Sequence, residues 1–319
     1  MQAYLARRLL LTVPTIFGVT VLIFLAMRVI PGDPLAMIQA EGSGSRILSA
    51  EQLQTARASL GLDKPYYVQY LEWVGAIVRG DLGESFWRGD KVRDIIARRA
   101  PITAQIAVMA ILVSWVIGVP VGVFGAMRPN SRPDVTTRLT VIVFLAIPSF
   151  WLGLLLISGS VLWLNWRPSL TIVYFTDDPI KNLQMTVGPA IVMGVGLAAV
   201  IARVARSATL EVLHEDYVRT ARAKGLPEKA VLTIHVLRNA LLPIITVSGL
   251  ALGGLLGGSV AVERAFGVPG LGLALVMALA ERDWMVIQNL VLLYGLIFTV
   301  LNLLVDVSYS WVDPRIRYG

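Results

Sequence analysis

The chain has 319 residues, of which 56% are hydrophobic and only 15% are charged. Since soluble domains carry about 25% charged residues, this composition excludes an ordinary soluble protein and predicts an integral membrane protein. The net charge of +7 requires no nucleic acid partner, because membrane proteins collect lysine and arginine on their cytoplasmic side, and the absence of cysteine excludes disulfides and thiolate metal sites.

Six segments without Asp, Glu, Lys or Arg are long enough to cross a bilayer, which takes about 20 mostly apolar residues. They are Leu9–Met27, Ala100–Met127, Leu139–Trp166, Asn182–Ala202, Asn239–Val262 and Trp284–Val305. We therefore expect an all-α integral membrane protein with six transmembrane helices. The shorter segment Ala265–Ala280 is interrupted by glycine and proline, which favours a re-entrant or interfacial segment.

The first span follows two arginines, a pattern that secretory signal peptides share. Because its apolar run is longer than the usual 7–15 residues and no Ala-x-Ala site follows, we expect a retained membrane helix. If the N-terminus is cytoplasmic, 14 of the 28 lysines and arginines fall on that side, including the cluster between Arg203 and Arg238. The nine in the long segment Pro31–Arg99 are set aside, because loops beyond about 60 residues are poor reporters of orientation. The short opposite loops hold only Arg167, Lys181, Arg264 and Arg282. The positive-inside rule therefore predicts that both termini and the loop 203–238 are cytoplasmic.

The long segment Pro31–Arg99 has the composition of a folded extracytoplasmic excursion. Ser49–Gln52 forms a capping-box pattern, and a second helix is expected from Lys64-Pro65 to Gly80, with its aromatic residues on one face. We expect that face to pack as scaffold, and an interfacial helix or a contact for an external partner is the alternative. The predicted domains are 1–99, a membrane helix with its extracytoplasmic segment, and 100–319, a five-helix core with the loop 203–238.

The chain lacks recognisable sites for catalysis or for ATP. It has no G-x-x-x-x-G-K-[ST] phosphate loop, and His214-Glu215 does not continue into H-E-x-x-H because position 218 is Val. We therefore expect a protein that is not an enzyme and binds no cofactor or metal itself. The interiors of the predicted spans carry no charge, which argues against the rival class, an ion-coupled secondary transporter.

A charged stretch, Glu215–Pro243, separates two apolar spans. A helix is expected over Glu211–Lys224, with Glu215 and Arg219 as an i,i+4 ion pair. Gly225-Leu226-Pro227 then predicts a sharp stop, after which a second helix leads back to the membrane.

Small residues mark two further candidate sites. Thr220, Ala221 and Ala223 keep the first helix of the charged stretch thin, as a helix docked in the groove of a partner requires. Glycine and proline recur inside the spans, where small residues let membrane helices approach closely. The best candidate for a pathway gate is Leu252–Ser259, with these lining residues: Leu252, Leu255, Leu256 and Ser259.

The segment Arg219–Gly225, RTARAKG, resembles the cytoplasmic EAA–G loop of ABC-importer permeases, with Ala221 and Gly225 in register. Arg219 and Thr220 replace the usual Glu and Ala, a departure that looks like the peptide/nickel subfamily. Further motifs of that subfamily extend over nearly the whole chain: PGDP (Pro31–Pro34), LGLDKP (Leu60–Pro65), GDLGESF (Gly80–Phe86), FGVPGLG (Phe266–Gly272) and DPRIR (Asp313–Arg317). The chain thus resembles the B-type permease subunit of dipeptide/oligopeptide importers.

This resemblance implies a type I ABC-importer permease fold in the bacterial plasma (inner) membrane and ATP-driven uptake of di- or oligopeptides. Nickel, opines, glutathione and oligosaccharides remain open as substrates. It also implies a second permease subunit, two cytoplasmic ATPases that bind ATP and Mg²⁺, and an extracytoplasmic substrate-binding protein. The residues expected to dock on an ATPase are Glu215, Asp216, Tyr217, Arg219, Thr220, Ala221, Lys224 and Gly225.

Overall fold

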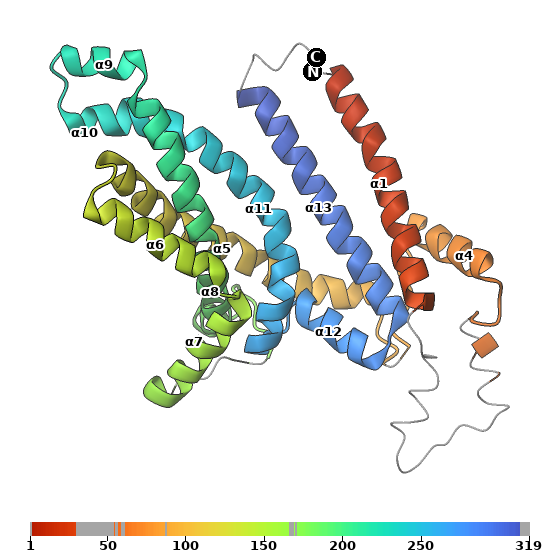
Figure 1. The fold of residues 1–319 in the computed structure, drawn as a ribbon. Helices are drawn as coiled ribbons and strands as arrows, with labels where there is room; N and C mark the ends of the chain where they lie inside the picture. The colour runs from red at the N-terminus through yellow and green to blue at the C-terminus, as the bar shows by residue number, and fades with distance from the viewer. Residues whose placement is uncertain are drawn as a thin grey trace. The chain divides into compact units, whose positions relative to one another are not determined.

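The computed structural model describes residues 2–29, 54, 57–58, 61–86, 88–165, 169 and 171–312, with side chains left out at 2–9 and 306–312. The capping-box pattern at Ser49–Gln52 and the PGDP and DPRIR motifs lie outside the described residues. Helices dominate the described chain (Figure 1). They are α1 (Gln2–Val29), α4 (Tyr66–Val78), α5 (Val92–Met127), α6 (Arg132–Ala146), α7 (Ser149–Leu164), α8 (Pro179–Leu213), α9 (Asp216–Ala223), α10 (Glu228–Ala230), the π-helical η1 (Val231–Val236), α11 (Leu237–Phe266), α12 (Leu271–Glu281) and α13 (Trp284–Val312). The prediction of an all-α protein is confirmed.

Five helical segments of the described chain are long and apolar enough to cross a membrane: α1, α5, α8, the continuous α10–η1–α11 segment and α13. The pair α6 and α7 makes a sixth span if it is counted as one. The predicted span Leu139–Trp166 is not one straight helix, because α6 and α7 meet at 94°. Pro148 causes the break, since it lacks an amide donor and forces the preceding Ile147 into extended geometry, with φ −85° and ψ 123°.

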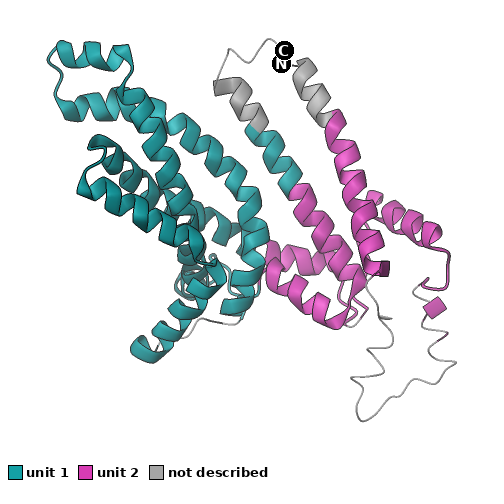
Figure 2. Cartoon of the chain, in the orientation of Figure 1, with its two compact units in different colours: residues 1, 102–269, 298–319 teal, residues 2–101, 270–297 magenta. Residues whose placement is uncertain are grey.

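The chain forms two compact units (Figure 2). Unit 1 comprises residues 1, 102–269 and 298–319, and unit 2 comprises residues 2–101 and 270–297. The helix α12 and the first part of α13 thus group with the N-terminal part of the chain. The predicted domains 1–99 and 100–319 do not include this grouping, because they place residues 270–297 with the rest of the C-terminal part.

Unit 2 has a core in which α1 and α4 meet α12 and α13. Phe24, Trp73 and Leu290 are buried in it. Tyr70 contacts the ring of Phe24 edge-on at 5.3 Å and Trp73 stacks on it at 6.3 Å between centroids. Tyr70 and Trp73 thus pack as predicted for scaffold, but Tyr66 and Tyr67, which were predicted to share their face, are exposed. The opposite face of α4 remains exposed, with Tyr67 at 70%.

Unit 1 is built around α8, which packs against α6, α7 and α11. Glycines allow α5 to approach α8 closely. An ideal Cβ on Gly118 would lie 2.6 Å from the carbonyl oxygen of Ala198, and one on Gly122 would lie 2.4 Å from that of Ala202. Such distances leave no room for any side chain, which confirms the predicted role of small residues in helix packing.

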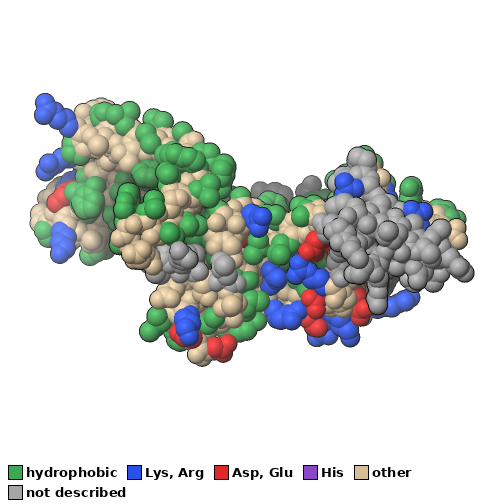
Figure 3. Space-filling view, turned by 90° about the horizontal axis from the view of Figure 1, so that it is seen from below, with side chains coloured by type: hydrophobic (Ala, Val, Ile, Leu, Met, Phe, Trp, Pro, Cys, Tyr) green, Lys and Arg blue, Asp and Glu red, His purple; other side chains and the backbone are tan. Residues whose placement is uncertain are grey.

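Large apolar side chains cover much of the surface. Val116, Phe124 and Leu162 on the spanning helices are 74%, 69% and 73% exposed. Figure 3 shows broad areas of hydrophobic side chains, with Lys, Arg, Asp and Glu gathered in separate patches. Exposed apolar areas of this extent mark contact with lipid or with other subunits.

Candidate functional site

A helical hairpin, His214–Val236, joins α8 to α11; its outgoing arm is α9, and its return arm is α10 with η1 (Figure 1). The helix α8 ends at Leu213, and α9 begins at Asp216, so the single helix predicted over Glu211–Lys224 is wrong. Glu215 has the extended geometry of an N-cap residue, with φ −68° and ψ 144°. The break lets α9 leave the course of α8 and lie beside η1.

The predicted ion pair between Glu215 and Arg219 does not form in the structure. Glu215 stands outside the helix, and Arg219 instead pairs with Asp216, with 3.4 Å between Nη1 and Oδ1. The two side chains are 67% and 95% exposed, so the pair contributes little to stability. Both side chains therefore remain accessible to a partner.

The sharp stop predicted after α9 is confirmed. Gly225 adopts φ +80°, which glycine tolerates best, and Pro227 is the N-cap of α10. Arg222 closes the turn by donating two hydrogen bonds to Glu228, of 3.1 and 2.7 Å. These bonds raise the pKa of Arg222 above its ordinary value, so the guanidinium stays charged. The π-helical geometry of the return arm has no counterpart in the predictions.

The hairpin has a hydrophobic core of its own. Val218, Ala221, Val231 and Val236 are at most 5% exposed, and the end of α8 packs against them. Ala221 therefore faces inward, where its small side chain lets α9 pack closely on η1. The predicted role of Ala221 in the groove of a partner stays a prediction, and its contacts in the structure lie within the hairpin.

The outer face of the hairpin is polar and exposed. It carries seven of the predicted docking residues: Glu215, Asp216, Tyr217, Arg219, Thr220, Lys224 and Gly225. Tyr217 also anchors the hairpin, since its hydroxyl accepts a 2.7 Å hydrogen bond from Asn239 Nδ2 at the start of α11. No atom lies within 4 Å of an ideal Cβ on Gly225. We call these exposed residues of α9 and its flanking turns the outer face.

A buried ion pair ties α8 to α6. Asp134 is fully buried and accepts hydrogen bonds from Arg206 Nε at 2.6 Å, Arg206 Nη2 at 2.9 Å and the backbone N–H of Asn130 at 2.9 Å. Arg206 lies seven residues before the end of α8, or about 10 Å along the helix. Sequence reasoning missed this pair, because nothing local shows that residues 72 positions apart meet. It provides a stiff connection from the base of the hairpin to α6.

A second set of buried polar groups crosses unit 1. Glu263 lies in the last turn of α11 and is fully buried, and it accepts a 2.8 Å hydrogen bond from Thr103. Gln105 Nε2 donates to Asn182 Oδ1 and, at 3.3 Å, to Thr186 Oγ1. The predicted span ended at Val262, so the inclusion of Glu263 in the helix was not anticipated. These contacts fix α5 against α8 and α11.

The predicted gate residues lie on the packed side of α11. Leu256 is 7% exposed and Ser259 is fully buried, while Leu252 and Leu255 are partly exposed. The uncovered stripe of α11 instead carries Gly254, Gly257 and Gly258, with nothing within 4 Å of an ideal Cβ at any of them. A role for the four predicted residues in a pathway stays a prediction.

Comparison with known proteins identifies the family. Residues 118–318 match the model of the inner membrane component of binding-protein-dependent transport systems, and residues 1–107 match the model of its N-terminal part. The oligopeptide transport system permease protein AppB of Bacillus subtilis (strain 168) is 40% identical over 324 residues and covers 100% of both chains. The dipeptide transport system permease protein DppB of Escherichia coli (strain K12) is 40% identical over 342 residues, covering 100% of this chain and 99% of its own.

A solved structure supports the fold. A chain of the MetNI methionine ABC transporter, in inward-facing conformations, matches with a TM-score of 0.56 and 22% identity, over 69% of this chain and 96% of that chain. The two family models together span most of the sequence and agree with this fold. The chain belongs to the inner membrane permease components of binding-protein-dependent ABC transport systems, and it is a non-catalytic membrane subunit.

Proposed function

We propose that this permease serves an ATP-driven importer of di- or oligopeptides, and that the hairpin is the surface on which a cytoplasmic ATPase subunit docks. The main support for the docking role is that the hairpin has its own hydrophobic core and an exposed polar outer face. Because Val218 and Val231 are fully buried within it, the hairpin keeps its shape without a partner. A preorganised surface loses little entropy on binding.

The contacts of the hairpin supply a route for movement. The α8 helix runs directly into the hairpin, and the Asp134–Arg206 pair ties α8 to α6. Tyr217 adds a second anchor, through Asn239, to α11. A displacement of the outer face by an ATPase would therefore move the helices of unit 1 together. The complete importer would contain a second permease subunit, two ATPases that bind ATP and Mg²⁺, and an extracytoplasmic substrate-binding protein.

Peptides are the substrate class that the relatives support. AppB and DppB are named for oligopeptide and dipeptide transport, and the 38% identical GsiC of Escherichia coli O6:H1 for glutathione, itself a peptide derivative. Nickel, opines and oligosaccharides are the alternatives. To distinguish these substrates, uptake of radiolabelled dialanine is measured in the presence of an excess of each alternative ligand. Competition by tripeptides but not by Ni²⁺ or sugars is the expected result.

The docking role is tested by adding bulk to the outer face. Thr220 is exposed, and its side chain bonds only within α9, to the carbonyl of Asp216. We expect Thr220→Trp to fold normally but to clash with a docked ATPase, at a cost of ~1–3 kcal/mol, which lowers affinity about tenfold or more. ATPase co-purification and dialanine uptake in proteoliposomes should both fall.

The matched control is Thr176→Trp, an exposed threonine in the loop before α8 on the predicted opposite side of the membrane. It should leave co-purification and uptake unchanged. Normal co-purification with Thr220→Trp would refute the docking role. If the wild-type complex, with docking intact, imports neither dialanine nor tripeptides, the peptide substrate is refuted instead.

A further inference from the structure

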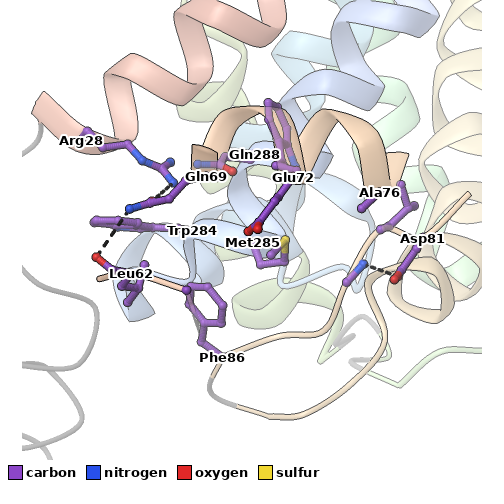
Figure 4. A pocket seen from close by; sticks show the side chains of 14 residues that line it. Arg28, Leu62, Gln69, Glu72, Ala76, Asp81, Phe86, Trp284, Met285 and Gln288 are labelled. Atoms are coloured by element: carbon purple, nitrogen blue, oxygen red, sulfur yellow. Dashed lines mark hydrogen bonds between the residues drawn. The ribbon is translucent and has the colours of Figure 1, made fainter. Parts of the chain in front are cut away.

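Unit 2 contains a cavity of about 240 Å³ (Figure 4). Its walls come from the C-terminal end of α1, one face of α4, the loop after α4 and the first turns of α13. Trp73, Trp284 and Phe86 make much of the lining apolar.

Three buried N–H donors line this cavity without an acceptor among the described residues. They are Arg28 Nε, Trp73 Nε1 and Gln288 Nε2. Trp73 is 7% exposed and Gln288 only 3%. Buried donors are normally satisfied, since leaving one unpaired costs its full desolvation penalty. Three of them around one cavity indicate a ligand that supplies acceptor oxygens.

The charges around the cavity favour an anionic ligand. Arg28 has no carboxylate partner in the described chain; its Nη2 donates to Gln69 Oε1 at 2.9 Å, and its guanidinium lies 3.6 Å from the ring centroid of Phe24. The acidic side chains are already engaged, because Glu72 accepts from Lys64 at 2.6 and 2.9 Å and Asp81 accepts from the N–H of Gly83. An anionic oxygen beside Arg28 and Gln288 would gain charge-assisted hydrogen bonds.

The surroundings of the cavity point to a lipid as the source of that anion. Arg28 and Trp284 stand at the ends of two candidate spans, where headgroups lie and where tryptophan is enriched. Two of the helices that line the cavity also carry exposed apolar side chains: Leu25 and Val29 on α1 are 51% and 78% exposed, and Leu71 and Val78 on α4 are 65% and 81% exposed. A ligand with an anionic head and apolar tails fits this combination.

We propose that this cavity binds the phosphate of a phospholipid headgroup, held by Arg28, Trp73 and Gln288. The bound phosphate joins α1, α4 and α13 and so stabilises unit 2. The proposal depends on the membrane location of the chain and not on its substrate or on the docking role of the hairpin.

The probe is dihexanoylphosphatidylglycerol, a soluble short-chain phospholipid, added to the delipidated transporter complex in detergent. Native mass spectrometry measures its binding to this subunit. Gln288→Glu keeps the shape of the side chain and places a negative charge beside the phosphate, so we expect binding to weaken about tenfold or more. Trp73→Phe removes one N–H with little change in packing, and we expect a loss of roughly threefold to tenfold.

Matched controls are Gln184→Glu, exposed on α8, and Trp163→Phe, 84% exposed on α7. Both should bind the lipid as the wild type does. If Gln288→Glu lowers the melting temperature, Trp73→Phe decides the question, since it adds no charge. The proposal is overturned if both cavity variants bind like their controls, or if dihexanoylglycerol, which lacks the phosphate, binds equally well. Tighter binding of dialanine or of inorganic phosphate than of the phospholipid also overturns it.

Discussion

Replacing Asp134 by Asn tests the buried pair that connects α8 with α6. The substitution keeps the shape of the side chain but removes its charge, and one oxygen acceptor becomes an NH₂ group. Asp134 is fully buried and accepts three hydrogen bonds, two of them from Arg206. In the variant, Arg206 faces an amide nitrogen that cannot accept from it, and its charge has lost its counterion.

The magnitude follows from the burial of the two partners. Removing one partner of a buried ion pair costs ~3–5 kcal/mol, because an uncompensated charge remains. The side chain of Arg206 is 22% exposed and regains some hydration, so we expect the lower end, ~3 kcal/mol. Arg138 is the control: its Nη2 lies 3.6 Å from Asp134 Oδ2, and its side chain is 46% exposed. Arg138→Gln should cost less than ~1 kcal/mol.

The assay combines unfolding with transport. Unfolding midpoints of the complex in detergent give the cost of Asp134→Asn, Arg206→Met and the double variant. The double variant should be more stable than the sum of the two single losses by about 2 kcal/mol, since it leaves no unpaired charge. In proteoliposomes, ATP hydrolysed per peptide imported should rise in Asp134→Asn while ATPase co-purification stays normal.

Three results would each contradict part of this reasoning. Equal destabilisation by Asp134→Asn and Arg138→Gln would mean that the buried pair contributes no more to stability than the exposed one. Additive single effects would mean that Asp134 and Arg206 do not act on each other. If Asp134→Asn is destabilised as expected but hydrolyses the same amount of ATP per peptide imported, the pair only stabilises the fold and does not transmit movement from the hairpin to α6.

Two further predictions concern helix packing and capping. Gly122→Ala should prevent the close approach of α5 to α8, because the new Cβ would lie 2.4 Å from the carbonyl oxygen of Ala202. The yield of folded protein in detergent chromatography should therefore fall. Gly257→Ala, with nothing within 4 Å of its new Cβ, should leave that yield unchanged. Asp178 caps α8 by accepting the N–H of Lys181, which holds the pKa of its carboxyl below the usual range. Its stabilising effect is therefore present above the unfolded pKa and is lost as the pH falls through the lower folded pKa, so Asp178→Asn should flatten the acid end of the stability profile; an unchanged profile would refute the cap.

The sequence by itself determined the membrane class, the number of apolar segments and the sharp turn at Gly225. These features are local, because hydrophobic length and the backbone freedom of glycine act within a few residues. The charged stretch and its motifs also located the hairpin, on which seven of the eight residues predicted to dock are exposed. Sequence reasoning did not predict that Ala221 faces the core of the hairpin, because the direction of a side chain on a short helix depends on what the helix packs against.

Only the tertiary structure decided the contacts between distant segments. Sequence reasoning also did not anticipate the extended Glu215 or the π-helical return arm. Asp134 meets Arg206, and Arg28, Trp73 and Gln288 surround one cavity, although no local pattern relates them. Apolar length specifies that a helix crosses the membrane, but it does not specify its neighbours. Close contacts between side chains make that choice, since lipid solvates the apolar surface of a helix as well as another helix does.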